Sequence, residues 1–169
     1  TITNLKLNLE AVDIASTDDA ERRRSIKAFK NTIDAAERLG CRWVRPAPTS
    51  KRPDIGRLAE GLKELVDYAG PKQISVLVEN NGWMSRDPDA LPAIVAACDG
   101  SVAVQPDTGN WADDVRYAGL EKAFPHAVTC DFKAFELGAD GSGDRYASAC
   151  ECDLHRSELF GKFHHHASE

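Results

Sequence analysis

The chain has little of what marks membrane, secreted or nucleotide-binding proteins. No apolar run approaches the ~18 residues of a membrane span, and residues 1–4, TITN, lack the basic and apolar regions of a signal peptide. The glycine-rich motifs GxGxxG and GxxxxGK[ST] do not occur. The net charge is −6 and the basic residues are scattered, which argues against nucleic acid as the main partner. We therefore expect a cytoplasmic protein with neither a membrane nor a nucleic acid as its partner.

The cysteine pattern indicates no disulfide framework and no zinc site. The number of cysteines is odd, at five. They are Cys41, Cys98, Cys130, Cys150 and Cys152. The last two form a C-x-C pair without a second pair at the spacing of a zinc ribbon. We expect reduced thiols, as in a cytosolic protein.

Strand-like and helix-like segments alternate from the N-terminus to about residue 135. The apolar patterns predict strands at 5–12, 41–45, 74–79, 102–107 and 126–133. They predict helices at 18–39, 53–69, 87–98 and within 114–124. This order predicts a single α/β domain with a parallel sheet. Beyond residue 135 the pattern weakens, and residues 163–166, FHHH, fit a last strand, a tail or a tag remnant.

Two parallel architectures compete at this point. A doubly wound sheet accommodates five strands in 169 residues, although its nucleotide-binding members have a glycine-rich turn that is absent here. A complete (β/α)8 barrel needs about 250 residues, so this chain is too short for one. Composition does not choose between the two.

Two predicted strands end on a carboxylate followed by glycine and asparagine. Residues 74–82 read ISVLVENNG and residues 101–110 read SVAVQPDTGN, which places Glu79 and Asp107 at the carboxyl ends of their strands. In parallel α/β folds this edge of the sheet is where sites are built. Two carboxylates there suggest a divalent-metal site, although strand-end acids also serve as loop or helix caps.

Four segments resemble the xylose-isomerase-like TIM barrels, the sugar-phosphate isomerase/epimerase superfamily. Residues 76–82 (VLVENNG) resemble that family's VLxENHG, and residues 106–110 (PDTGN) its PDxGN. Residues 132–141 (FKAFELGADG) and 35–45 (AAERLGCRWVR) resemble two further segments in the same order.

The resemblance covers about residues 5–141 and implies an incomplete (β/α)8 TIM barrel. Strands one and two would be missing, and residues 142–169 match poorly. The domain prediction is thus one partial TIM-barrel domain over residues 1–169. Because an open parallel sheet leaves exposed edges, pairing with another copy as a homo-oligomer is one way to cover them.

The resemblance further implies one divalent metal at the mouth of the barrel. Glu79 and Asp107 stand at the first two ligand positions, and Asp131 at a third, where many relatives carry histidine. The fourth ligand falls loosely on Glu169 or, more weakly, on Glu158. Three carboxylates favour Mn²⁺ or Mg²⁺, with Zn²⁺ or Co²⁺ as other candidates.

Roles for the remaining residues follow from the same resemblance. Glu79 is the expected base that removes a proton beside a substrate carbonyl, and Lys133 the group that stabilises the developing oxyanion. Asn81 and Asn110 are expected to hydrogen-bond substrate hydroxyls, and Trp83 to pack on a sugar ring.

For two basic residues, a purely structural ion pair is an alternative to a role in the site. Arg45, at its strand end, either binds an anion or forms a surface ion pair. Lys133 is also placed to pair with Asp131 or Glu136.

Three functions remain open from the sequence. The first is a metal-dependent isomerase or epimerase of a sugar or small keto-polyol, acting through an enediolate. The second is a metal-dependent dehydratase, a lyase that expels a β-hydroxyl from a cyclic keto-polyol after the same proton removal. The third is a non-catalytic remnant or fragment of a barrel.

Overall fold

A computed structural model describes residues 2–7, 9, 12–46 and 51–133 of the 169-residue chain. Within them lie four strands: β1 (Asn4–Leu7), β2 (Trp43–Pro46), β3 (Ser75–Val78) and β4 (Ala103–Val104). They form one sheet in the order β1-β2-β3-β4, and every pair of neighbours is parallel. The predicted parallel α/β fold is confirmed.

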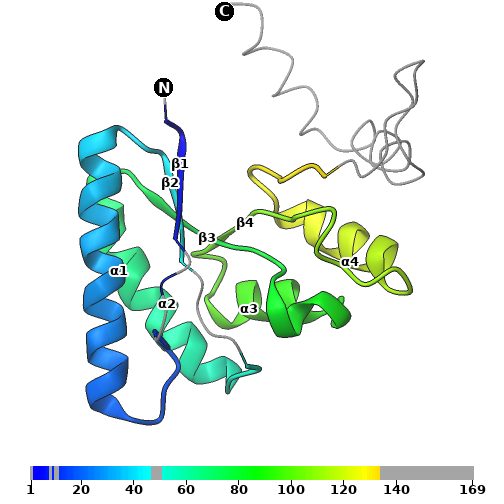
Figure 1. Ribbon diagram of the computed structural model, residues 1–169, viewed down its shortest axis with the longest axis horizontal. Coiled ribbons are helices and arrows are strands. Elements are labelled where there is room, and N and C mark those ends of the chain that lie inside the picture. The colour runs from blue at the N-terminus through cyan, green and yellow to red at the C-terminus, as the bar shows by residue number, and fades with distance from the viewer. Residues whose placement is uncertain (1, 8, 10–11, 47–50, 134–169) are drawn as a thin grey trace, which may run out of the picture.

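A helix follows each strand. The α-helices are α1 (Asp19–Leu39), α2 (Ile55–Ala69), α3 (Ala90–Ala97) and α4 (Arg116–Ala123). Short 3₁₀ helices lie at η1 (Gly70–Lys72), η2 (Gly82–Arg86) and η3 (Phe124–His126). Each α-helix contacts the next, and they follow one another along the outside of the sheet (Figure 1). Strands in chain order with crossovers of one hand produce this arrangement.

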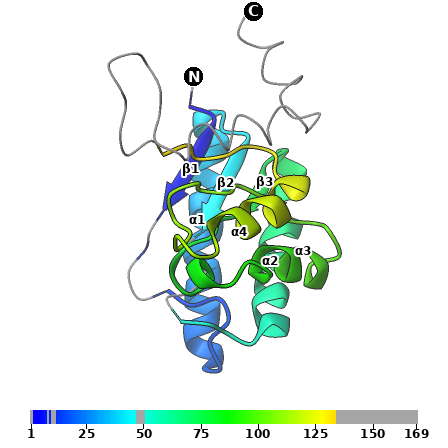
Figure 2. The same cartoon turned by 90° about the vertical axis from the view of Figure 1, so that its right-hand side faces the viewer.

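The sequence of helix α1 determines where this helix begins and ends. Asp18 is the N-cap, and its carboxylate accepts hydrogen bonds from two backbone N–H groups of the first turn. Phe29 and Ile33 lie on the face that packs into the core. Gly40 ends the helix at a φ of 71°, and its N–H reaches carbonyls of the last turn. The two views of the molecule place α1 beside α2 (Figures 1 and 2).

The two faces of the sheet differ in chemistry. Val44, Val76 and Val104 are buried in the core shared with the helices. The other face combines the polar side chains of Asn4, Arg45 and Gln105 with the buried Leu77, and across it Nδ2 of Asn4 donates to Oε1 of Gln105 at 3.0 Å. Since β1 and β4 are separated by two strands in the sheet, this contact requires a strongly curled sheet, as in a barrel wall.

Three predicted strands differ clearly in extent from the observed ones, and one of them, 102–107, is observed as only Ala103–Val104. The first strand is observed as Asn4–Leu7, and residues 9 and 12, which the structure also describes within the predicted span 5–12, are not in a strand. Asp13 closes a turn in which its Oδ1 accepts the N–H of Ala15 at 2.8 Å. The predicted fifth strand, 126–133, begins with the last residue of η3 and pairs with its neighbour only at isolated bridges. These bridges join Val104 to Ala127 and Asp107 to Asp131, so one extra residue on the later segment interrupts the ladder.

Several predictions fall on residues outside the described part of the chain. They concern Glu136, Cys150, Cys152, Glu158, Glu169 and the histidine run at 164–166. The separate segment 142–169 belongs with them. Of the helices at 19–39, 55–69, 90–97 and 116–123, none has the length and apolar character for crossing a bilayer.

Candidate metal centre

Glu79 follows β3 directly and is 6% exposed. Its position alternates with Val76 and Val78, which face the helices, so its side chain lies on the inner face of the sheet. Oε1 accepts a hydrogen bond from Nδ2 of Asn110 at 3.0 Å. Oε2 lies 3.0 Å from Nε of Arg45, as an ion pair rather than an aligned hydrogen bond. The carboxylate that the sequence assigned as base is therefore buried and held at both oxygens.

Asp107 lies three residues beyond the end of β4 and is 3% exposed. Its Oδ1 accepts the N–H of Gly109 at 2.9 Å, and Oδ2 lies 2.8 Å from Nζ of Lys133. Its backbone exchanges two hydrogen bonds with the side chain of Asn80, which is fully buried. The short turn Asp107-Thr108-Gly109 thus fixes the direction of the carboxylate.

Asp131 reaches the same place from the segment beside β4. A parallel bridge joins it to Asp107, and its Oδ1 accepts from Nε2 of Gln105 at 3.2 Å. Carboxylate oxygens of Glu79, Asp107 and Asp131 all lie within 4.8 Å of one another. The structure therefore brings together the three residues that the resemblance implied as metal ligands.

Three basic side chains surround these acids in the described part of the chain. They are Lys6, Arg45 and Lys133. Lys6 contacts two of the acids: its Nζ is 3.3 Å from Oε2 of Glu79 and forms an ion pair with Oδ2 of Asp131. Three carboxylates are thus matched by three cations, which explains how two acids can be almost fully buried.

The donor set fits a hard divalent cation. Three carboxylates converge at the edge of a parallel sheet where sites are usually built, and oxygen is the ligand that Mg²⁺ and Mn²⁺ prefer. The neighbouring cations are not ligands, and one of them, Lys6, contacts carboxylate oxygens of both Glu79 and Asp131.

The other predicted site residues differ in how directly they contact the triad of acids, Glu79, Asp107 and Asp131. Asn110 bridges its two sides, since its Oδ1 accepts from Nζ of Lys133 at 2.9 Å while its amide donates to Glu79. Asn81 is exposed, as the residue before η2. Trp83 is half-buried, and the guanidinium of Arg52 lies 5.2 Å from its ring. Arg45 is only 5% exposed, so its ion pair with Glu79 is buried, unlike the surface ion pair that was one of the two alternatives for this residue.

Sequence reasoning missed two residues of the centre. Lys6 lies within the predicted first strand, and its alternation with Leu5 is the signal that could have placed it on the inner face. Asn80 was part of a motif but received no role. No local pattern predicts its bond to a backbone 27 residues away.

The thiol of Cys130 lies close to the acids. Burial raises the pKa of this thiol, and the negative charge of Asp107 raises it further. Cys41, Cys98 and Cys130 are free thiols.

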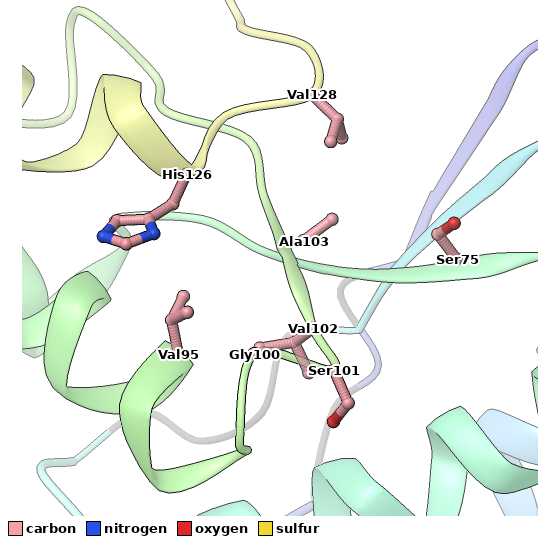
Figure 3. A pocket seen from close by; sticks show the side chains of 8 residues that line it. All are labelled: Ser75, Val95, Gly100, Ser101, Val102, Ala103, His126 and Val128. Carbon is pink, nitrogen blue, oxygen red and sulfur yellow. The ribbon is translucent and has the colours of Figure 1, made fainter.

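A separate groove of about 320 Å³ opens at the opposite end of the strands (Figure 3). It is lined at the starts of β3 and β4 by Ser75 and Ala103, with His126 and Val128 on another side. None of the predicted site residues lines it.

The fold and the site together define the class of protein to which this chain belongs. Parallel strands alternate with helices, the sheet is curled, and acidic side chains converge at its carboxyl edge, as in part of a TIM barrel. The sequence model of the family described as xylose isomerase-like TIM barrel matches residues 1–148. The chain belongs to this family, as the resemblance of its motifs implied. A search of curated proteins finds no match.

Solved structures with the same fold include three enzymes. The 3-keto-D-glucoside 4-epimerase of E. coli is 15% identical with a TM-score of 0.65, and the match covers 86% of this chain and 64% of that one. D-psicose 3-epimerase from Clostridium cellulolyticum is 15% identical with a TM-score of 0.64, covering 85% and 55%. The probable 3-DHS dehydratase of Bacillus anthracis is 14% identical with a TM-score of 0.60, covering 82% and 52%. The chain therefore spans between 52% and 64% of these structures.

Proposed function

We propose that this chain carries the metal-holding part of an isomerase or epimerase that acts on a sugar or small keto-polyol. The observation that carries the proposal is the convergence of Glu79, Asp107 and Asp131 within 4.8 Å at the carboxyl edge of the sheet. The two epimerases with the same fold support the choice of reaction class.

Glu79, Asp107 and Asp131 would hold one divalent cation, with Mn²⁺ or Mg²⁺ preferred and Zn²⁺ or Co²⁺ as other candidates. When bound, such a cation supplies Lewis acidity that polarises a carbonyl oxygen.

The chain's own residues supply the proton chemistry. Glu79 is the proposed base that removes the proton from the carbon beside the carbonyl. Arg45 and Asn110 hold its two oxygens, and this fixes the orientation that proton transfer needs. Arg45 is therefore assigned a positioning role, in place of the anion binding that the sequence suggested as one alternative.

Lys133 is the proposed stabiliser of the negative charge that develops on the substrate oxygen. Its Nζ lies 2.8 Å from Asp107, and its side chain is 45% exposed, so the ammonium is both anchored and accessible. Asn81, Asn110 and Trp83 remain proposed contacts to substrate hydroxyls and to the ring face.

A dehydratase of a cyclic keto-polyol is the second candidate. It begins with the same proton removal and differs in the loss of a β-hydroxyl. The probable dehydratase of Bacillus anthracis has the same fold as this chain.

Metal binding and turnover test the proposal together. Mn²⁺ binding is measured by isothermal titration calorimetry, and turnover is followed on a panel of ketoses and cyclic keto-polyols. E79Q and D107N each remove one charged ligand without changing side-chain size, and we expect both to abolish metal-dependent turnover with little loss of fold. D89N is the matched control, because Asp89 is an exposed acid paired with Lys122.

Retained turnover in E79Q or D107N would contradict the assignment of the site. A well-folded wild-type chain that binds no Mn²⁺ and turns over no substrate would favour the non-catalytic remnant.

A further inference from the structure

Lys6 contacts two of the three acids of the triad. Its Nζ lies 3.3 Å from Oε2 of Glu79 and forms an ion pair with Oδ2 of Asp131. By contrast, the ion pair described for Arg45 joins it to Glu79, and the one for Lys133 joins it to Asp107. Lys6 therefore bridges two of the three carboxylates from a third strand, β1.

The position of this ammonium conflicts with that of a bound cation. A divalent ion bound to oxygens of Glu79 and Asp131 would lie beside Nζ of Lys6, which contacts the same two carboxylates. Two positive charges so close together repel each other strongly. The ion and Lys6 would also draw on the negative charge of the same two carboxylates, Glu79 and Asp131. One of them must leave when the other is in place.

Lys6 can leave, whereas Arg45 cannot. The side chain of Lys6 is 28% exposed and ends in a flexible four-carbon stem, so its ammonium can turn toward water. The side chain of Arg45 is 6% exposed and is held against Glu79. Binding of a divalent cation would therefore displace Lys6 and leave the buried ion pair between Arg45 and Glu79 intact.

We propose that Lys6 is a resident counter-ion that a divalent cation must displace, and that it therefore sets the metal affinity of the centre. The inference rests on the proposed metal site and adds to it a residue that determines how tightly the site binds. When the cation is absent, Lys6 supplies one of the three positive charges that balance the triad and bridges Glu79 and Asp131.

The test compares Mn²⁺ affinity in variants at position 6. Binding is measured by calorimetry and by the electron paramagnetic resonance signal of free Mn²⁺, so it does not depend on turnover. K6M removes the charge and keeps most of the apolar stem. K6R keeps the charge. K72M is the matched control, because Lys72 pairs with Asp34 and Glu37 on α1, away from the triad.

We expect K6M to bind Mn²⁺ more tightly than the wild type by about 10-fold to 100-fold, the range over which groups beside a metal site change affinity. K6R and K72M should remain close to the wild type. Circular dichroism melts establish folding, and K6Q takes the place of K6M if that variant does not fold.

The outcomes separate this inference from the proposed function. If the wild type binds Mn²⁺, D107N does not, and K6M binds no more tightly, the role of Lys6 is overturned and the metal site stands. If neither the wild type nor K6M binds Mn²⁺, the metal site is overturned and the inference with it. Binding by K6M alone would support the inference in its strongest form.

Discussion

Asn80 and Asp107 hold each other through two hydrogen bonds between neighbouring strand ends. Nδ2 of Asn80 donates to the carbonyl oxygen of Asp107 at 3.0 Å, and the N–H of Asp107 donates to Oδ1 of Asn80 at 2.7 Å. Both residues are buried. Since Glu79 precedes Asn80 directly, this bridge fixes the spacing between the two buried acids of the candidate centre.

We expect N80A to lower the free energy of unfolding by about 2–4 kcal/mol, because two buried backbone groups lose their partner. Urea denaturation followed by circular dichroism measures the change. N81A is the matched control, since Asn81 is exposed and lies outside the bridge. Equal stability of N80A and N81A would show that the bridge contributes nothing measurable.

Gly119 allows Trp111 to pack against α4. A Cβ at position 119 would lie 2.6 Å from two atoms of the Trp111 ring, which is itself 2% exposed. We expect G119A to destabilise the fold by about 1–3 kcal/mol through overpacking. Thermal or urea unfolding measures the loss.

The control is G70A. Gly70 has helical backbone angles, and a Cβ there would meet nothing within 4 Å, so we expect a gain of about 0.4–1 kcal/mol. If G119A were as stable as G70A, the close packing of Trp111 on α4 would be refuted.

The N-cap of α1 gives a pH dependence with a definite sign. Hydrogen bonds from the backbone N–H groups of Glu21 and Ala20 lower the pKa of Asp18 from its ordinary value of 3.8. The ionised form is therefore favoured by folding, and its contribution is fully present above 3.8 and is lost as the pH falls through the lower folded pKa.

We expect D18A to melt below the wild type near neutral pH, and this difference in Tm to close in acid. Thermal melts across the acidic range measure it, with D19A as the control, because Asp19 lies in the first turn without being the cap. A difference in Tm that persisted unchanged into strong acid would rule out the ionised cap as its cause.

The candidate ligands were predictable because parallel strands share one carboxyl edge. Apolar runs that end in Glu79 and Asp107 place both acids there, and the family motif added Asp131. The contacts that make the centre neutral were not predictable. Lys6 is 73 residues from Glu79 in the chain, and only the curl of the sheet brings them together.

The role of Arg45 could not be decided from the sequence either. Its position at a strand end was visible, but the choice between a surface ion pair and an anion site depended on burial, which is set by its neighbours in space. Similarly, a strand pattern at 126–133 does not reveal the extra residue that breaks its ladder, because pairing depends on the partner strand.

The sequence by itself determined the alternation of strands and helices, the parallel sheet and the acids at its carboxyl edge. These features depend on side-chain periodicity and on local capping, which are short-range. Only the tertiary structure decided which cations neutralise those acids and which amide fixes their spacing. Such contacts join residues far apart in the chain, and their geometry exists only once the sheet has curled.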